Sequence, residues 1–292
     1  MDEVATFEAE RPRLRRLAYR MLGSFAEADD VLQDAWLRWQ RAHATVGHPG
    51  AWLTRTVTRL CLDALKSARA RRETYVGPWL PEPMADAVEA AAAVPATDDL
   101  TLTLMVALER LSPLERAAFL LHDVFEVPLQ EVAVTLQREP AAVRQLAVRA
   151  RRHVGDARPR FAVDRAEGER LAQAFFEASS SGDVHRLQTL LADDAVVQSD
   201  GGGRVAAFRK PLVGRDRIAR AYAGFARKAR IGAVMIRGLW IDGLPGYLSR
   251  NFDGQLQTTA VQIEDGRIVA VYVTRNPEKL ERLVAALQAT TA

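Results

Sequence analysis

A short segment near the middle of the chain places several arginines among regularly spaced apolar residues. The segment REPAAVRQLAVRARRHV, residues 138–154, carries Arg144, Arg149, Arg151 and Arg152. Guanidinium groups bind phosphates and base edges, so an arginine-rich helix face is typical of a protein that contacts nucleic acid. A solvated face on a plain helical bundle gives the same pattern, and this alternative stays open for the segment taken alone.

The residues before this segment complete the spacing of a helix-turn-helix. Apolar residues predict a helix over 129–136, a turn at 137–139 and a second helix that begins at Pro140. The turn carries Gln137 where glycine is often found, which costs about 1 kcal/mol in a left-handed conformation. We expect base edges to meet the start of the second helix, at Glu139, Pro140, Ala141, Arg144 and Gln145. We expect phosphates to meet Arg149, Arg151 and Arg152.

A second basic helix is predicted over residues 51–72, after a loop at 43–50. Trp52 stands at its start beside the loop. Such a helix can follow a phosphate backbone while the loop holds an unstacked base, although a solvated amphipathic helix has the same pattern. The candidate DNA-binding residues of this helix are Arg55, Arg59, Asp63, Lys66 and Arg69.

An acidic cluster precedes this helix, in the segment EADDVLQDAW at residues 27–36. Asp29, Asp30 and Asp34 repel DNA and must face something else. They are either solvated or in contact with a basic protein partner.

Composition and charge limit the class of protein. The 292 residues are 48% hydrophobic and 26% charged, which indicates a soluble globular chain of about two domains. The N-terminus lacks the order of a secretory signal and no apolar run is long enough to cross a bilayer, so we expect a cytoplasmic protein without membrane contact. Cys61 is the single cysteine and the histidines are scattered, so we expect no disulfide, metal or cofactor.

The helical elements fall into two groups separated by an acidic stretch. A helical hairpin is predicted over 8–42, and a second helical unit runs from Asp99 to about residue 158, with Ser112 and Glu115 as a capping box. The stretch between them, 74–98, contains prolines around VEAAAAV and no lysine or arginine, which predicts a linker with one helical turn. Two basic surfaces on either side of an acidic linker suggest a polyanion bound at two places.

The pattern changes after about residue 164 to an α+β domain. Helices are predicted at 165–181, 184–191, 215–229 and 277–289, and period-two runs predict strands at 195–200, 205–210, 232–241, 255–264 and 267–274. The segment EDGR, 264–267, predicts a hairpin turn. We expect a strongly curved antiparallel sheet, folded as a half-barrel with an interior pocket.

The order of the N-terminal pieces resembles a bacterial RNA polymerase sigma factor of the compact extracytoplasmic-function group. Residues 14–39 resemble the polymerase-binding region, 51–73 resemble the segment that recognises and opens the −10 element, and the helix-turn-helix resembles the domain that reads the −35 element. The resemblance covers residues 8–158. It implies polymerase contacts at Asp29, Asp30, Gln33, Asp34 and Trp36.

The C-terminal part resembles the SnoaL-like, nuclear-transport-factor-like fold, which one branch of these sigma factors carries as an extension. Three short signatures of that branch are present: WLPEP, DGGGR and NPEKL. Arg204 and Glu278 replace the usual lysine and aspartate and keep their charges. The resemblance implies that the extension docks on the linker through Trp79, Leu80, Pro81, Glu82, Pro83, Asp200, Gly201, Gly202, Gly203, Arg204, Asn276, Pro277, Glu278, Lys279 and Leu280.

The sequence therefore predicts a sigma factor with core RNA polymerase and promoter DNA as partners, regulated in cis and without catalytic residues. The expected parts are 1–73, a linker at 74–98, the helix-turn-helix domain at 99–160 and the SnoaL-like domain at 164–292. Two alternatives stay open: a one-component regulator whose C-terminal pocket binds a small ligand, and an enzyme domain fused to a DNA-binding module. The enzyme alternative would use an aspartate for acid–base chemistry, among Asp193, Asp194, Asp200 and Asp242.

Overall fold

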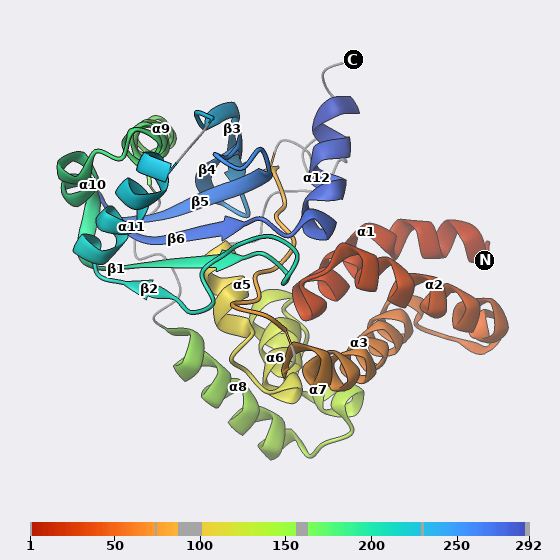
Figure 1. Ribbon diagram of the computed structural model, residues 1–292. Helices are drawn as coiled ribbons and strands as arrows, with labels where there is room; N and C mark the ends of the chain where they lie inside the picture. The colour runs from red at the N-terminus through yellow and green to blue at the C-terminus, as the bar shows by residue number, and fades with distance from the viewer. Residues whose placement is uncertain (1, 74, 87–100, 156–162, 229–230, 290–292) are drawn as a thin grey trace. The chain divides into compact units, whose positions relative to one another are not determined.

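The computed structural model describes residues 2–73, 75–86, 101–155, 163–228 and 231–289. The chain forms two compact units. The first, helical unit comprises Met1–Thr74 and Leu104–Ala157, and the second comprises Tyr75–Thr103 and Arg158–Ala292. Residues 75–86, the described part of the stretch between the two groups of helices, thus pack with the C-terminal part of the chain (Figure 1).

The helical unit begins with an antiparallel hairpin of α1 (Glu3–Leu22) and α2 (Phe25–Ala42), followed by the 3₁₀ turn η1 (His43–Thr45) and α3 (Pro49–Glu73). Asp2 and Ser24 cap the first two helices, and Gly23 ends α1 in the left-handed region with φ of 70°. Leu14, Leu17 and Trp39 are buried between the helices, as the periodicity predicts. Cys61 is fully buried, which raises the pKa of its thiol.

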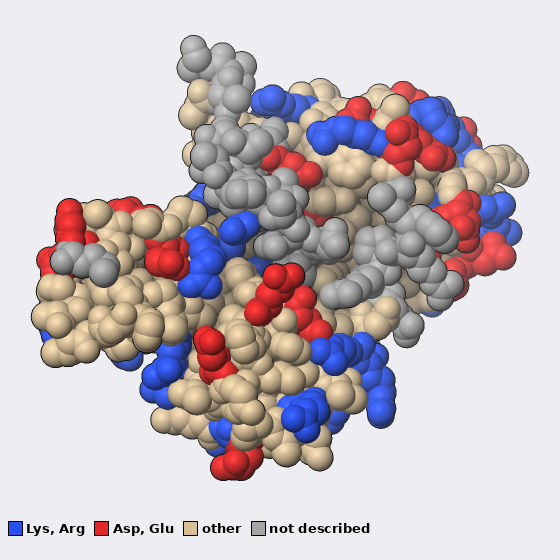
Figure 2. Space-filling view, turned by 180° about the vertical axis from the view of Figure 1, so that it is seen from behind, with Lys and Arg blue, Asp and Glu red and all other residues tan. Residues whose placement is uncertain are grey.

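The second half of this unit contains α5 (Leu102–Leu108, of which the first two residues belong to the second unit), α6 (Pro113–Phe119), the π-helical turn η2 (Leu120–Val124), α7 (Leu129–Leu136) and α8 (Pro140–Val154). The predicted capping box is confirmed: Ser112 and Glu115 each accept the other's backbone N–H. Buried Arg116 pairs with Glu109 at 2.7 Å and donates to the carbonyl of Met21 at 2.7 Å, which ties α6 to the end of α1. On the face shown in Figure 2, basic side chains form several groups with acidic ones between them.

The second unit is built on a six-stranded sheet. Its elements are α9 (Arg165–Ser181), α10 (Val184–Leu190), β1 (Leu191–Asp200), β2 (Leu212–Val213), α11 (Arg215–Lys228), β3 (Val234–Ile241), β4 (Leu244–Arg250), β5 (Leu256–Glu264), β6 (Arg267–Thr274) and α12 (Pro277–Ala289). The strand order is β2-β1-β6-β5-β4-β3. Strands β3 to β6 form an antiparallel meander, and β1 pairs in parallel with β6. The sheet is therefore mixed, and the prediction of a wholly antiparallel sheet is wrong for one strand pair. The chain passes through α11 to β3 at the far edge, and the meander then returns strand by strand until β6 lies parallel to β1.

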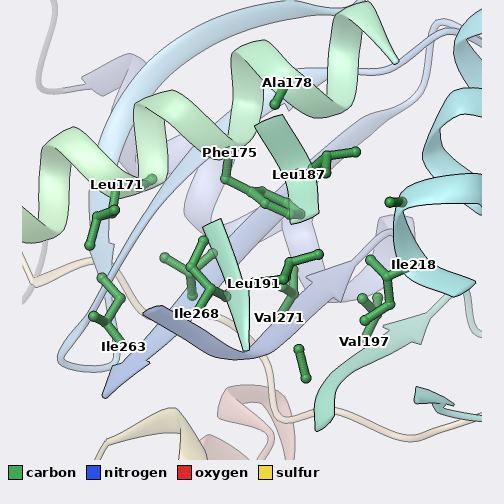
Figure 3. Packing of buried hydrophobic residues seen from close by; sticks show 14 of the residues in the cluster. Leu171, Phe175, Ala178, Leu187, Leu191, Val197, Ile218, Ile263, Ile268 and Val271 are labelled. Carbon is green, nitrogen blue, oxygen red and sulfur yellow. The ribbon is translucent and has the colours of Figure 1, made fainter. Parts of the chain in front are cut away.

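The core of this unit lies between the sheet and helices α9, α10 and α11. Phe175 of α9, Leu187 of α10 and Ile218 of α11 are fully buried against Val197 and Val271 of the sheet (Figure 3). Ala195 and Val197 of β1 and Val271 and Val273 of β6 belong to this layer with the period of two that a strand requires, and an irregularity in β6 separates them from Ile268. This packing fixes the ends of β1 and β6, where the signatures DGGGR and NPEKL begin.

One predicted strand is wrong, and two strands, β2 and β4, were not predicted. Residues 205–210 form turns and irregular chain, because the preceding glycines and the need to reach α11 leave no partner strand for them. Strand β4 was missed, because nearly all of its residues are buried on both faces and Pro245 and Gly246 interrupt the alternation. The EDGR turn is confirmed, with φ of 48° at Asp265 and 72° at Gly266. The helical turn predicted at VEAAAAV lies outside the described residues.

Within the described ranges, every helix is too short or too polar to span a membrane.

Candidate nucleic-acid interface and linker-docking site

Helices α7 and α8 form a helix-turn-helix whose inner faces are apolar. Val132 and Leu136 of α7 are buried with Val143 and Leu146 of α8, which holds the two helices together. Gln137 takes the left-handed conformation that the sequence predicted for the turn, with φ of 53° and ψ of 50°. The N–H of the next residue closes the turn on the Ala133 carbonyl, at 3.0 Å. The start of α8 is thereby fixed.

The residues expected to read bases lie on the outer side of this motif. Arg144 and Gln145 are exposed, and neither has a hydrogen-bond or ion-pair partner in the part of the chain that the structure describes. Glu139 and Ala141 are also exposed, and Pro140 is half-buried as the first residue of α8. The side chains at the N-terminal end of α8 are thus available to a partner, as a recognition helix requires.

The arginines further along α8 divide into two kinds. Arg149 pairs with Glu115 at 3.0 Å and Arg151 pairs with Asp123 at 2.6 Å, so both brace α8 against α6 and η2. Arg152 is exposed without a partner among the described residues. Burial opposes ionisation of Glu115, but hydrogen bonds from Ser112 and Arg149 outweigh it and lower the pKa of this carboxyl.

The candidate DNA-binding residues of α3 differ in exposure and in their partners. Arg55 and Arg59 are half-buried, and the Arg59 Nε donates to the carbonyl of Thr135 on α7 at 3.3 Å. Asp63 and Lys66 are exposed and pair with each other at 2.8 Å. The side chain of Arg69 lies outside the described part. Trp52 packs 5.6 Å from Trp39, measured between ring centroids, beside the loop that precedes α3.

The acidic cluster on α2 presents a mostly free surface. Asp30, Gln33 and Asp34 are exposed. Asp29 binds Arg15 of α1 through both carboxylate oxygens, at 2.6 and 2.7 Å, and Trp36 packs on Phe7 with ring centroids 5.0 Å apart. Three of the five expected polymerase contacts therefore point to solvent, and the other two also stabilise the helical hairpin.

The linker signature WLPEP is held by a buried ion pair at the ends of β1 and α12. Asp200 is fully buried and pairs with Lys279 at 2.7 Å. The Asp200 carboxylate accepts the Leu80 N–H at 2.8 Å, and Lys279 Nζ donates to the Leu80 carbonyl. Both backbone groups of Leu80 are thus used, and its side chain is fully buried. We call the set Trp79, Leu80, Asp200 and Lys279 the latch.

Two aromatic rings enclose the lysine of the latch. Lys279 Nζ lies 4.0 Å from the centroid of the Trp79 ring and 5.2 Å from that of Tyr75. The Tyr75 hydroxyl donates to Asp200 at 2.6 Å and accepts from the Asn276 amide at 3.1 Å. Burial and then the hydrogen bond to Asp200 raise the pKa of Tyr75. Sequence reasoning missed Tyr75, because it lies outside the WLPEP signature and meets Asp200 only through the fold.

The remaining residues of WLPEP, DGGGR and NPEKL surround the latch. Pro81 and Pro83 are buried and Glu82 is half-buried. Gly201, Gly202 and Gly203 form the turn after β1; a Cβ at Gly202, where φ is 62°, would lie 2.4 Å from the Asn276 amide. Arg204 forms an ion pair with Glu278, and Asn276 caps α12 by accepting the Glu278 N–H at 3.2 Å. Pro277 is the first residue of α12, and Leu280 is buried.

A second contact holds the linker further along. The Asp242 carboxylate accepts the Met84 N–H at 3.1 Å, and the Asp242 N–H donates to the Met84 carbonyl at 2.8 Å. Ala85 forms an isolated antiparallel bridge with Ile241. Residues 75–86 are therefore bound at both ends by the C-terminal domain.

None of the four aspartates considered for acid–base chemistry lies in the cavity of the C-terminal domain. Asp200 and Asp242 bind linker backbone, as described above. Asp193 pairs with Arg215 at 2.6 Å and is 80% exposed at its side chain, and Asp194 is exposed on the same strand. The residues that line the interior cavity of this domain include none of them.

Comparisons with known proteins agree with this arrangement. Residues 6–71 match the model of Sigma-70 region 2 and residues 101–154 match that of Sigma-70 region 4. The chain is 39% identical to the ECF RNA polymerase sigma factor SigJ of Mycobacterium tuberculosis, with 95% of this chain and 93% of SigJ covered. It is 32% identical to the probable ECF RNA polymerase sigma factor SigI of the same organism, with 97% and 96% covered.

A solved structure extends the likeness to the whole fold. The crystal structure of M. tuberculosis SigJ superposes with a TM-score of 0.77 at 35% identity, over 95% of this chain and 98% of SigJ. The fold class expected from sequence, helical sigma domains followed by an α+β domain with a curved sheet, is confirmed. The chain belongs to the extracytoplasmic-function RNA polymerase sigma factors.

Proposed function

We propose that this chain directs core RNA polymerase to promoters with two separated elements, and that its C-terminal domain regulates it in cis through the linker. Membership in the sigma family supports the first part. The proposed functional parts are residues 1–73 for polymerase binding and the −10 element, 74–98 as the linker, 99–160 for the −35 element and 164–292 for regulation. Since polymerase and promoter DNA are in the cytoplasm, the chain acts there.

The −35 element is read by the N-terminal end of α8. Arg144 and Gln145 are the base-reading candidates because both are exposed and unpaired among the described residues, and Glu139, Pro140 and Ala141 lie at the same end. Arg152 binds phosphate. Arg149 and Arg151 reach phosphate only in addition to, or in exchange for, their ion pairs with Glu115 and Asp123.

The −10 element and the polymerase meet opposite kinds of surface. On α3, Arg55, Arg59, Asp63, Lys66 and Arg69 are the proposed promoter contacts, and Trp52 lies beside the loop that receives an unstacked base. On α2, the exposed carboxylates of Asp30 and Asp34, with Gln33, Asp29 and Trp36, form the proposed polymerase contact.

The observation that carries the regulatory proposal is the latch. A buried carboxylate and a buried ammonium use their remaining hydrogen-bonding capacity on the two backbone groups of Leu80. Undocking the linker would remove the hydrogen bonds of Asp200 and Lys279 to Leu80 and expose the buried Leu80 side chain, so the docked linker is favoured. Because the linker joins the two promoter-reading parts, docking limits how they can separate.

We propose no covalent chemistry for the C-terminal domain. Asp200 and Asp242, the two buried aspartates considered for catalysis, bind the linker backbone and so already have a structural role. The same geometry supports a regulatory domain better than an enzyme.

Transcription with purified components tests the proposal. The full chain is added to core RNA polymerase and fragmented genomic DNA, and the start sites are mapped. We expect initiation at sites that share two sequence elements, and we expect Arg144→Ala to weaken the choice of the upstream element. A chain that only blocks initiation by another sigma factor would instead be a one-component regulator.

A further inference from the structure

Positive charge gathers in one stretch of the C-terminal domain. Between Asp200 and Asp242 the sequence carries ten lysines and arginines and a single acidic residue, Asp216. The stretch includes α11, which covers one face of the sheet together with α9 and α10 (Figure 1). Such a separation of charge within one domain indicates a surface that binds a polyanion.

Helix α11 carries four of these cations on one face. The spacing of Arg217, Arg220, Arg227 and Lys228 places them within roughly a third of the helix circumference. All four are exposed, and none has a hydrogen-bond or ion-pair partner in the part of the chain that the structure describes. Ile218, on the other side of the helix, is fully buried. We call the set Arg217, Arg220, Arg227 and Lys228 the basic face.

Acidic side chains on and beside α11 do not neutralise the basic face. Asp216 accepts from the Gln188 amide at 2.7 Å, and Glu177 of α9 pairs with Arg186 at 2.8 Å. Asp183, between α9 and α10, caps α10 by accepting the Arg186 N–H at 3.0 Å. These three carboxylates thus have other partners, and the charge of the basic face is left for a partner from outside the chain.

The loop before β2 adds two further cations. The ring of Phe208 packs on that of Phe225 of α11, with centroids 5.7 Å apart, which holds this loop against the helix. Arg209 and Lys210 follow directly, and both are exposed without partners among the described residues. Six such cations therefore come from α11 and the loop that packs on it.

A glycine in the middle of the basic face leaves room for close approach. Gly224 lies between Arg220 and Arg227, and a Cβ built there would meet nothing within 4 Å. Glycine in a helix interior is less favourable than alanine, and here no packing contact requires it. A phosphate backbone can therefore come close to the helix at this point, within reach of the cations on both sides.

The composition of α11 favours the phosphates of duplex DNA over bases. The helix has no asparagine or glutamine with which to read base edges, and Phe225, its exposed aromatic residue, is in contact with Phe208 and Tyr222. DNA bound by α8 is within reach, because the chain from Val154 to Arg165 spans at most roughly 40 Å, about one turn of the double helix.

We propose that the basic face, with Arg209 and Lys210, binds the phosphate backbone of duplex DNA without reading its sequence. The C-terminal domain then makes a DNA contact of its own beside those proposed for α3 and α8. Its place next to the −35 element rests on the proposed function of α8, whereas its affinity for DNA of any sequence does not.

The salt dependence of binding to random-sequence DNA tests the basic face. Affinity of the full chain for a fluorescent duplex of about thirty base pairs is measured by anisotropy at several salt concentrations. The variant carries Arg217→Gln, Arg220→Gln, Arg227→Gln and Lys228→Gln. We expect the slope of log affinity against log salt to become shallower by about three, because each phosphate contact contributes roughly 0.9, and the affinity at about 0.1 M salt to fall by about tenfold or more.

A control with the same change in net charge separates a contact from a general electrostatic effect. It replaces exposed arginines of α9, β3, β4 and β6: Arg170→Gln, Arg237→Gln, Arg250→Gln and Arg267→Gln. We expect this control to keep a slope close to that of the wild type. Equal losses in the two variants would overturn the proposal. Unchanged DNA binding by the basic-face variant, with weaker binding to core polymerase, would also overturn it and assign the face to an acidic protein surface.

Gly224→Leu tests close approach without changing any charge. Because a Cβ at this position meets nothing in the domain and leucine favours a helix, the melting temperature should not fall. We expect affinity for the random duplex to fall by about threefold or more, since the side chain keeps phosphates away from the cations. Ala166→Leu, at an exposed position of α9, should bind as the wild type does. Unchanged affinity in Gly224→Leu would contradict a backbone lying on the middle of this face.

Footprinting locates the contact on a promoter found by mapping start sites. We expect the wild-type holoenzyme to protect the DNA backbone within about one helical turn of the −35 element. The basic-face variant should lose this flanking protection and keep that of the element itself. Flanking protection that is the same in both would refute the location. A wild type that protects no −35 element, yet binds the random duplex through the basic face, would contradict the proposed role of α8 and leave the DNA contact standing.

Discussion

Asp200 shows how one residue can acquire several partners that lie far apart in the sequence. It is fully buried and binds Lys279, Tyr75 and the backbone of Leu80, all of them more than seventy residues away. The sequence predicted that the signatures containing Asp200, Leu80 and Lys279 would meet, but through the resemblance to a family. Nothing local to Asp200 indicates an ion pair, and Tyr75 was not expected at all.

Neutralising Asp200 tests how strongly the pair is held. Asp200→Asn leaves the buried Lys279 ammonium without its counter-charge, so we expect the free energy of unfolding to fall by about 3–5 kcal/mol. Chemical denaturation of the full chain measures the change. Lys279→Met combined with Asp200→Asn should cost less than the sum of the two single changes. Strictly additive losses would mean that the two groups do not depend on each other.

Glu115 makes the stability of the fold depend on pH. Its pKa in the folded chain is lowered, so it stabilises the fold fully above the ordinary value of 4.5, and this contribution is lost as the pH falls below it. We expect Glu115→Gln to be less stable than the wild type at neutral pH and to lose less stability between pH 4.5 and roughly pH 3. Thermal melts across this range measure both. Parallel curves for the two proteins would contradict the assignment.

At the scale of elements, local sequence signals predicted where the helices begin and end, but not which side chains on their surfaces form ion pairs. The bounds of α7 and α8 follow from apolar spacing, Pro140 and the turn at Gln137, all within a short stretch of chain. The pairing of Arg149 and Arg151 could not be predicted, because Glu115 and Asp123 lie about thirty residues earlier and meet α8 only in the folded unit. The arginine stripe is thus partly structural.

The recognition helix offers a matched pair of variants. Arg144 and Arg152 are both exposed without partners among the described residues, so neither replacement removes an ion pair there. We expect Arg144→Ala to weaken binding to the cognate −35 element by about 1–3 kcal/mol with little effect on other DNA. Arg152→Ala should weaken all DNA and reduce the slope of affinity against salt by about one. Binding isotherms of the polymerase holoenzyme at several salt concentrations compare them.

The opposite assignment would be visible in the same data. Equal losses on cognate and unrelated DNA for Arg144→Ala, with an altered salt slope, would identify a phosphate contact and remove this residue from base reading.

At the scale of the whole molecule, the docking of the linker could be expected from the family resemblance but not from the linker's own composition. Its prolines and acidic residues indicated only a connection between helical groups, whereas residues 75–86 pack with the C-terminal domain. The hydrogen bonds responsible run from Leu80 and Met84 to Asp200 and Asp242, across more than a hundred residues of chain. The missed strand β4 and the parallel β1–β6 pair have the same origin, since both depend on non-local pairing.

The most direct test of regulation through the latch is promoter-directed transcription by Trp79→Ala, Lys279→Met and the double variant. Each full-length chain is combined with core polymerase on one promoter, and initiation is measured by run-off transcription. Because Trp79 and Lys279 act through one contact, 4.0 Å apart, both single changes should alter activity in the same direction. The account predicts that the double variant differs little from the stronger single variant. Independent, additive effects, or activity unchanged from wild type in all three, would contradict it.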